Sequence, residues 1–430
     1  MFSFAARART TIARISPQVW RVLTHSLLFG LAGSIADLLF NFYLVSLGYG
    51  ADTAGLMATV YRGAGALLGL PLGILIDRFG ARALLVVGAI GFGIAYALVL
   101  MVSQLWALIL FVFLAGATNV LTLTAVVPLL TGITDEQERA AVFGMNASAG
   151  LIIGLVGSSA GGLLPGTAAL ILGVATNDTA AYRMAPLRTF WATRSSTVAT
   201  NDTAAYRMAL SIVVVLGCLS ALPVLIGFRT RQPVSSPAPL VAAPERHMPP
   251  MRLVRFALPS LLLGIGGGLF LPFQNLFFRT VFGLNDAVVG VMLAMGALGM
   301  GLGALMGAPV AVRLGLRRAA SSLRFGAVFA VALMFLPVLP VVVVGYMLRG
   351  AFIAASYPLN DALVMQLTPL QQRGIAISLM SVLWSLGWSA AAWISGQVQV
   401  HYGFTPVLAA SLVAYALSAW AIWTLREEER

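Results

Sequence analysis

The sequence predicts an all-α membrane protein with twelve transmembrane helices in two six-helix bundles. Hydrophobic residues make up 60% of its 430 residues and charged residues only 9%, against roughly 25% charged residues in a soluble domain. Apolar runs of span length recur along the chain, and several motifs repeat between its two halves. So few charges could not cover the surface of a water-soluble fold, so lipid must solvate the chain.

The composition excludes several classes of function. All 26 basic residues are Arg, which excludes a GxxxxGK phosphate-binding loop and a Schiff-base lysine. The single cysteine, Cys218, excludes an internal disulfide. The sequence offers no nucleophile–base pair or metal-ligand motif, so we expect neither enzyme activity nor a cofactor. The net charge of +12 indicates Arg held on one side of a membrane rather than a nucleic-acid partner.

A transmembrane helix needs about 20 mostly apolar residues, and twelve such spans follow one another along the chain. They lie near residues 20–47, 53–76, 83–103, 105–130, 141–164, 209–228, 255–278, 287–311, 320–338, 341–366, 374–398 and 405–425. The first apolar run is too long for a secretory signal, so we expect it to remain as an uncleaved span. We expect spans 3, 6, 9 and 12 to face lipid, with no charge in their interiors.

A proline-rich segment separates the two sets of six spans. Residues 229–254 contain six prolines and predict a flexible cytoplasmic linker. The linker divides the chain into an N-terminal bundle (1–228) and a C-terminal bundle (255–430). With both termini in the cytoplasm, 19 of the 26 Arg fall on or beside cytoplasmic segments, as the positive-inside rule favours. We therefore expect a multi-pass protein of the cell (inner) membrane with cytoplasmic termini.

The two halves repeat each other at a nearly constant offset. The glycine motif at residues 65–73 matches residues 299–307 at an offset of 234, and the loop at 78–82 matches 313–317 at 235. The segment 134–139 after span 4 matches 368–373 after span 10, again at 234. Three equivalences at nearly one offset indicate a parallel duplication of a six-helix unit, with the halves related by pseudo-twofold symmetry.

The loop between spans 2 and 3 carries a family motif. It reads Gly73-Ile-Leu-Ile-Asp77-Arg78-Phe79-Gly80-Ala81-Arg82. With the twelve spans, the linker and the repeat, this motif makes the chain resemble the major facilitator superfamily (MFS) of secondary transporters over about residues 20–425. The family's loop is approximately G-x-x-x-D-R-x-G-R-R, so Ala81 departs from it at one basic position. The resemblance implies the MFS fold, a substrate site near the membrane midplane and alternating access.

The same resemblance assigns a gating role to this loop. The gating residues would be Gly73, Asp77, Arg78, Gly80 and Arg82. Asp77 would meet the positive N-terminal end of span 11, near Gly374, and hold the cytoplasmic side closed. The alternative is a charged loop that only fixes orientation. In the second half Val312 stands where the acid would be, so a latch there should be weaker or absent.

Two further positions depart from common family patterns. In span 5 the glycines at 157, 161 and 162 are present, but Ser158 replaces a proline that many family antiporters carry, and Ile153 replaces the first glycine. This leaves an antiport mechanism open. Span 4 has Asn119 and several threonines but lacks the Arg that many proton-driven members carry there.

Two opposite charges inside the membrane are the candidates for proton coupling. An ionisable group in hydrocarbon costs at least roughly 2.5–3.5 kcal/mol, so each needs a function or a partner. Asp37 in span 1 and Arg62 in span 2 lie at similar depth, about eleven residues from the same outer boundary. One hypothesis makes Asp37 a proton-coupling carboxylate that Arg62 modulates. The other makes the two a static ion pair that joins neighbouring helices.

Polar residues on the spans that line the cavity in the family are the candidates for substrate contact. They are Asn41, Asn119, Gln274, Asn275, Arg349, Tyr357 and Asn360. Span 11 adds Trp384 and Trp388, one helical turn apart on one face, which could stack on an organic substrate or simply pack. Asp361 lies near the cytoplasmic end and could be solvated or paired.

These observations predict a secondary active transporter of a small organic solute, coupled to protons and leaning towards efflux. Arg62 and Arg349 leave open the uptake of an anionic solute by proton symport. A third hypothesis is a non-transporting sensor or assembly partner derived from the same fold. We expect a monomer whose partners are the solute, protons and the lipid bilayer.

One segment fits none of these elements. The twelve residues Val174–Ala185 recur letter for letter at 198–209, an offset of 24. They predict an external loop over about 174–208, produced by a recent duplication or by an error in the deduced sequence. Deletion of one 24-residue unit should leave transport intact.

Overall fold

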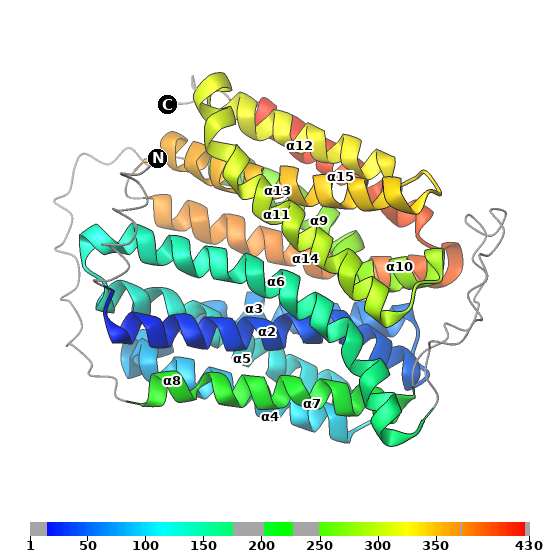
Figure 1. Cartoon of the computed structure of the whole chain (residues 1–430). Helices are drawn as coiled ribbons and strands as arrows, with labels where there is room; N and C mark the ends of the chain where they lie inside the picture. The colour runs from blue at the N-terminus through cyan, green and yellow to red at the C-terminus, as the bar shows by residue number, and fades with distance from the viewer. Residues whose placement is uncertain (1–14, 175–201, 227–248, 370–371, 426–430) are drawn as a thin grey trace, which may run out of the picture.

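The computed structural model describes residues 15–174, 202–226, 249–369 and 372–425, and every element assigned within these ranges is a helix (Figure 1). The proposed linker falls almost entirely outside them, as do residues 175–201 of the proposed external loop. The helices run roughly parallel to one axis, and α2 begins at the end of the molecule where α15 ends (Figure 1). We call this the terminal end and the opposite one the distal end.

The first half contains six long helices and one short one. They are α2 (Pro17–Ser46), α3 (Ala51–Phe79), α4 (Ala81–Met101), α5 (Leu105–Ile133), α6 (Glu136–Leu172), α7 (Thr203–Ser220) and the one-turn α8 (Leu222–Leu225). Apolar composition and helix-ending glycines explain the boundaries. At the junction of α3 and α4, Gly80 adopts φ +86°, a conformation that an L-residue with a side chain rarely adopts.

The second half repeats this order. It consists of α9 (Pro250–Phe270), the 3₁₀ turn η2 (Leu271–Phe273), α10 (Gln274–Phe282), α11 (Asp286–Leu314), α12 (Leu316–Leu333), α13 (Leu339–Leu367), α14 (Arg373–Tyr402) and α15 (Thr405–Trp423). Gly315, the repeat equivalent of Gly80, ends α11 with φ +77°. The repeated loop therefore has the same sharp turn in both halves.

The packing pattern confirms the twofold arrangement. In the first half α2 packs on α6 and α7, α3 on α5, and α4 on both α5 and α7. In the second half the equivalent pairs are α9 with α14 and α15, α11 with α13, and α12 with both α13 and α15. Across the interface, α3 packs on α14 and α6 packs on α11, and these two pairings are also equivalent under the repeat.

Within the described residues, ten spans are long and apolar enough to cross a membrane by length and composition. The helices α3 and α12 complete the twelve predicted spans, but both carry charges that lower their hydropathy. Large apolar side chains such as Leu170 and Ile171 are more than 70% exposed, as expected for helices that face lipid instead of water.

The structure corrects three details of the sequence prediction. The helix α7 begins at Thr203, so the second copy of the duplicated segment is partly helical, and α6 extends to Leu172. Arg324, one of the 19 Arg predicted to lie on or beside cytoplasmic segments, is fully buried about two turns inside α12. Charge is therefore present inside span 9, where a lipid-facing helix was expected to have none. Its guanidinium donates to the Pro259 carbonyl and to Ser418.

The predicted seventh span is not one continuous helix. It breaks at Leu271–Phe273 into a 3₁₀ turn, and α10 then continues from Gln274. Pro272 lacks a backbone N–H and interrupts the α-helical ladder there. Broken helices expose backbone carbonyls, and membrane proteins tolerate them where they line a cavity or are buried in protein.

Candidate functional site

The two halves enclose a central cavity of about 390 Å³, a size that suits a small organic molecule. Its charged lining residues are Asp37, Arg62 and Arg349, and its aromatic lining residues are Phe40, Tyr61, Tyr96, Tyr346 and Trp388. Asn41 and Gln274 also line it, together with the broken segment at Leu271 and Pro272. Helices from both halves therefore contribute to one polar and aromatic cavity inside an apolar protein.

Asp37 and Arg62 both line this cavity. Both side chains are exposed to it. The guanidinium of Arg62 is near enough to act on the carboxylate electrostatically, yet the described residues include no ion pair between the two within 4.0 Å. The hypothesis of a static buried ion pair is therefore not supported by this geometry.

Arg62 instead faces the other half of the molecule. Its guanidinium carbon lies 5.3 Å from the ring centroid of Trp388 and 5.8 Å from that of Trp384. The two indoles lie 5.1 Å apart and tilted at 38° on α14. A guanidinium within about 6 Å of an indole face is attracted to it, so Arg62 forms a cation–π contact across the interface.

Arg349 is the charged residue that the second half contributes. It is 4% exposed and donates a 2.9 Å hydrogen bond to the hydroxyl of Tyr415. Its guanidinium carbon lies 5.8 Å from each of the Phe270 and Tyr346 ring centroids. Its Nε has no hydrogen-bond partner. The aromatic residues hold the guanidinium in place, but none of them neutralises it.

At the distal end the halves are joined by two asparagines related by the internal repeat. Asn41 and Asn275 are 234 residues apart, and the Asn41 amide donates a 2.9 Å hydrogen bond to the Asn275 side-chain oxygen. Asn41 also donates to the Pro272 carbonyl, and Asn275 donates to the Leu38 carbonyl at 2.6 Å. Leu38 and Pro272 are again 234 apart, so the bonds are reciprocal about the pseudo-twofold axis. We call these bonds the asparagine clasp.

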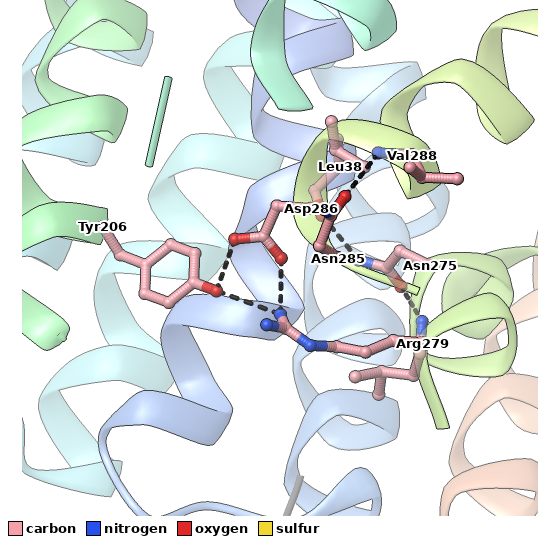
Figure 2. A network of polar contacts seen from close by, with 8 residues as sticks. Leu38, Tyr206, Asn275, Arg279, Asn285, Asp286 and Val288 are labelled. Atoms are coloured by element: carbon pink, nitrogen blue, oxygen red, sulfur yellow. Dashed lines mark hydrogen bonds and ion pairs between the residues drawn. The ribbon is translucent and has the colours of Figure 1, made fainter. Parts of the chain in front are cut away.

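A buried ionic cluster lies beside the clasp (Figure 2). Arg279 on α10 forms an ion pair of 2.7 Å with Asp286 at the start of α11. From the first half, the hydroxyl of Tyr206 on α7 donates to Asp286 at 2.8 Å and accepts from Arg279 at 3.0 Å. Phe42 covers the guanidinium at 4.3 Å from its ring centroid. Both halves therefore contribute to one desolvated cluster.

Small residues close the rest of the distal interface. A Cβ added to Gly162 on α6 would lie 2.5 Å from the Asp286 carbonyl oxygen, and one added to Gly55 on α3 would lie 2.6 Å from that of Ala392. The Thr59 hydroxyl donates to the Ser389 carbonyl in the same region. Backbones approach this closely only where side chains are absent.

The terminal end shows no comparable closure among the described residues. An added Cβ at Gly73, Gly80 or Gly374 would meet no atom within 4 Å, although Gly73 and Gly374 lie where the predicted latch would form. Arg78 is exposed, and Arg82 donates to the Val224 and Leu225 carbonyls of its own half. The side chain of Asp77 lies outside the described set. Among the described residues, the contacts that join the two halves through polar groups and close backbone approaches are therefore concentrated at the distal end.

Of the predicted substrate residues, the cavity brings together Asn41, Gln274, Arg349 and Trp388. Its lining does not include Asn119, Asn275, Tyr357, Asn360 or Trp384. Asn275 belongs to the clasp and Trp384 contacts Arg62, while Asn360 is buried in α13. Two residues of the same span can therefore differ in whether they line the cavity, because their side chains point in different directions or lie at different depths.

Sequence reasoning missed the cluster of Tyr206, Arg279 and Asp286. Tyr206 belongs to the duplicated segment, which suggested a loop. Arg279 lies just after the predicted span 7, and Asp286 lies just before the predicted span 8. One signal was available for the clasp, since Asn41 and Asn275 are separated by the repeat offset itself. No comparable signal links Tyr206 to a residue 80 positions away.

Solved transporters share this architecture. The nucleoside transporter NupG superposes with a TM-score of 0.72 at 14% identity, covering 95% of this chain and 99% of that one. A bacterial homolog of the human lysosomal transporter Spinster, in an inward-facing and occupied conformation, gives 0.67 at 16% identity over 94% and 92%. A single-residue variant of the E. coli fucose:proton symporter FucP gives a TM-score of 0.56 at 15% identity over 94% of this chain and 96% of that one. These similarities concern the fold alone.

No curated protein matches the chain significantly. The family profile for the Major Facilitator Superfamily matches residues 22–259 and 256–430, and thus nearly the whole chain. Together with the membrane-spanning helices, the pseudo-twofold packing and the central cavity, this match shows that the protein belongs to the Major Facilitator Superfamily and is a secondary transporter rather than an enzyme.

Proposed function

We propose that this transporter couples the movement of a small organic solute to a proton gradient through Asp37. The observation that carries the proposal is the position of Asp37, whose side chain lines the cavity and is exposed there. A carboxylate inside a membrane protein that is not locked in an ion pair can exchange a proton with the water of the cavity. It can also respond to the charge of a bound solute.

Arg62 modulates this exchange. With Asp37 ionised, the guanidinium of Arg62 is attracted towards the carboxylate. With Asp37 protonated, that attraction disappears and the contact with Trp384 and Trp388 prevails. Protonation would then alter a contact between the two halves, which is what coupling a proton to a rocking motion requires.

Alternating access supplies the transport step. In the present state the asparagine clasp, the ionic cluster and the glycine contacts close the distal end. Opening that end requires these contacts to break together as the halves rock. The opposite state would be held by the loop carrying Gly73, Asp77, Arg78 and Gly80 against the start of α14, and Arg82 would anchor this loop to its own half.

The charges of the cavity bear on the direction of transport. Two guanidiniums, Arg62 and Arg349, face one carboxylate, which supports an anionic solute. Protonation of Asp37 removes a negative charge that repels such a solute, so proton and anion favour each other's binding. This relation gives symport, and uptake is the mode that the charges support. The mainly aromatic and apolar lining supports export of a small organic compound as the second candidate.

We place the protein in the cell (inner) membrane as a monomer with cytoplasmic termini, because most Arg then lie on the cytoplasmic side. The terminal end is then the cytoplasmic one, and the cavity opens inwards. The cavity lined by both halves supports transport over a sensor that carries no solute.

A flux assay on proteoliposomes tests the coupling. A pH gradient is imposed, and proton movement is followed with a trapped pH dye while a panel of organic anions, neutral compounds and cations is added. Asp37→Asn should abolish solute-dependent proton movement while leaving exchange of the solute between equal pools. The matched control is Asp135→Asn, an acid exposed at the N-cap of α6, which should behave as the wild type. Undiminished proton movement in Asp37→Asn would remove Asp37 from the mechanism.

A further inference from the structure

Arg349 is a buried cation in the cavity wall without an acidic partner in the described part of the chain. It is 4% exposed, its Nε lacks a hydrogen-bond partner, and it lines the cavity. Its described contacts are the neutral Tyr415 hydroxyl and the faces of Phe270 and Tyr346. A buried charge normally has a counter-charge. Here an aromatic frame fixes the guanidinium and leaves its charge uncompensated.

We propose that Arg349 is the specificity-determining residue of the transporter and that it binds the oxyanion of a small organic anion. This inference rests on the proposed function and names its substrate class. A guanidinium offers donors in a planar fork that matches a carboxylate or related oxyanion. Because the cation is already desolvated and oriented, the solute supplies the missing counter-charge without any rearrangement of the side chain.

The surroundings of Arg349 define the rest of the ligand. Tyr346 donates from its hydroxyl to Gln274, which fixes one wall of the cavity beside the guanidinium. Trp388, on another helix of the same half, contributes an aromatic side chain to the lining of the same cavity. A ligand with an oxyanion at one end and a planar apolar body at the other fits these two features. The cavity of about 390 Å³ limits that body to a small molecule.

Asp37, which the first half contributes to the cavity lining, makes the affinity for the anion depend on pH. An ionised Asp37 repels an anion held at Arg349 across the same cavity, and a protonated Asp37 does not. Binding of the anion should therefore tighten as pH falls through the titration of Asp37, and this dependence should disappear in Asp37→Asn. Arg62, which contacts Trp384 and Trp388, is the other cation that faces the cavity and contributes to attraction over a longer range.

Binding to the purified full-length protein tests the proposal with three isosteric probes. Benzoate carries the oxyanion, benzamide is its neutral analogue, and benzamidinium is its cationic analogue. Calorimetry should show that benzoate binds at least about tenfold more tightly than either analogue. Phenyl phosphate and benzenesulfonate extend the series and distinguish a carboxylate site from a general oxyanion site.

Variants locate the effect at Arg349. Arg349→Met should lose the preference for benzoate, and Arg349→Lys should retain a weaker preference because the charge remains. Arg324→Met is the matched control, since Arg324 is also fully buried but does not line the cavity. It should bind benzoate as the wild type does. A thermal unfolding curve for each variant identifies any that fail to fold, and Arg349→Lys then decides the question.

The outcomes separate this inference from the proposed function. Equal binding of benzoate and benzamide by the wild type, or unchanged benzoate preference in Arg349→Met, would overturn the anion site. If a neutral compound also drives proton movement through Asp37, the proposed function stands and this inference fails. If Asp37→Asn leaves proton movement unchanged while Arg349→Met abolishes anion binding, the anion site stands and the coupling proposal fails.

Discussion

Arg279 and Asp286 illustrate at the scale of single residues how a membrane protein accommodates charge. Both are almost fully buried, with side-chain exposures of 0% and 4%, and they neutralise each other at 2.7 Å. Tyr206 contributes a hydroxyl from the other half, which donates to Asp286 and accepts from Arg279. A buried pair of this kind is costly to break from one side, because the remaining charge has no solvent.

We predict that the two single variants Arg279→Met and Asp286→Leu are each less stable than the double variant. Removing one partner of a buried pair costs about 3–5 kcal/mol, whereas replacing both by apolar residues is close to neutral. Thermal unfolding in detergent, followed by circular dichroism, measures the effect. A double variant whose destabilisation equals the sum of the two singles would mean that the charges do not interact.

At the scale of elements, the distal closure depends on helices that meet through glycine. Gly162 on α6 lies against α11 without room for a side chain, and Gly166 one turn later has open space around it. The equivalent contact of Gly55 on α3 with α14 shows that the pseudo-twofold symmetry extends to the closest approaches of the backbone. Such contacts hold the helices of the two halves together at the distal end. When the halves rock, the helices can separate there without any rearrangement of side chains.

We predict that Gly162→Ala shifts the protein towards the state that is open at the distal end. The added methyl group would lie 2.5 Å from the Asp286 carbonyl oxygen, so the two helices must move apart. Labelling of Ser158→Cys, placed in the cavity in a background that lacks Cys218, by a membrane-impermeant maleimide added from the distal side measures the shift.

Gly166→Ala is the matched control for this experiment, because it adds the same methyl group to the same helix where nothing lies within 4 Å. Its labelling rate should equal that of the parent protein. Equal labelling of the two alanine variants would indicate that the contact between α6 and α11 does not hold the distal end closed.

At the scale of the whole molecule, the duplicated segment adds length without adding a span. The second copy supplies the start of α7, where Asp202 caps the helix and Tyr206 reaches the ionic cluster. The two copies are identical over twelve residues, so one copy suffices to supply these groups. The fold therefore needs only one unit of the repeat.

We predict that deletion of residues 174–197, which joins Gly173 directly to Val198, leaves transport and thermal stability unchanged. The remaining copy retains the capping aspartate and the tyrosine of the cluster. Flux in proteoliposomes and thermal unfolding measure the outcome. A deletion of 174–209, which removes both copies, should abolish both properties, and loss of transport in the shorter deletion would assign a function to the extra unit.

The sequence by itself determined the all-α membrane class, the approximate positions of most spans, the duplication and the family. These features follow from local properties, because an apolar run of span length must be a helix in lipid and because a duplication leaves a fixed offset. Asp37 and Arg62 could be placed at one depth by counting residues, since helical rise is constant.

Only the tertiary structure decided which residues share a surface. Arg62 lies over Trp384 and Trp388 instead of in an ion pair with Asp37, and Arg279 forms the distal cluster with Tyr206 and Asp286. Helix rotation and the break at Pro272 set these contacts, and neither can be recognised from the periodicity of the sequence. Sequence order fixes the depth of a side chain, whereas packing fixes its direction and partner.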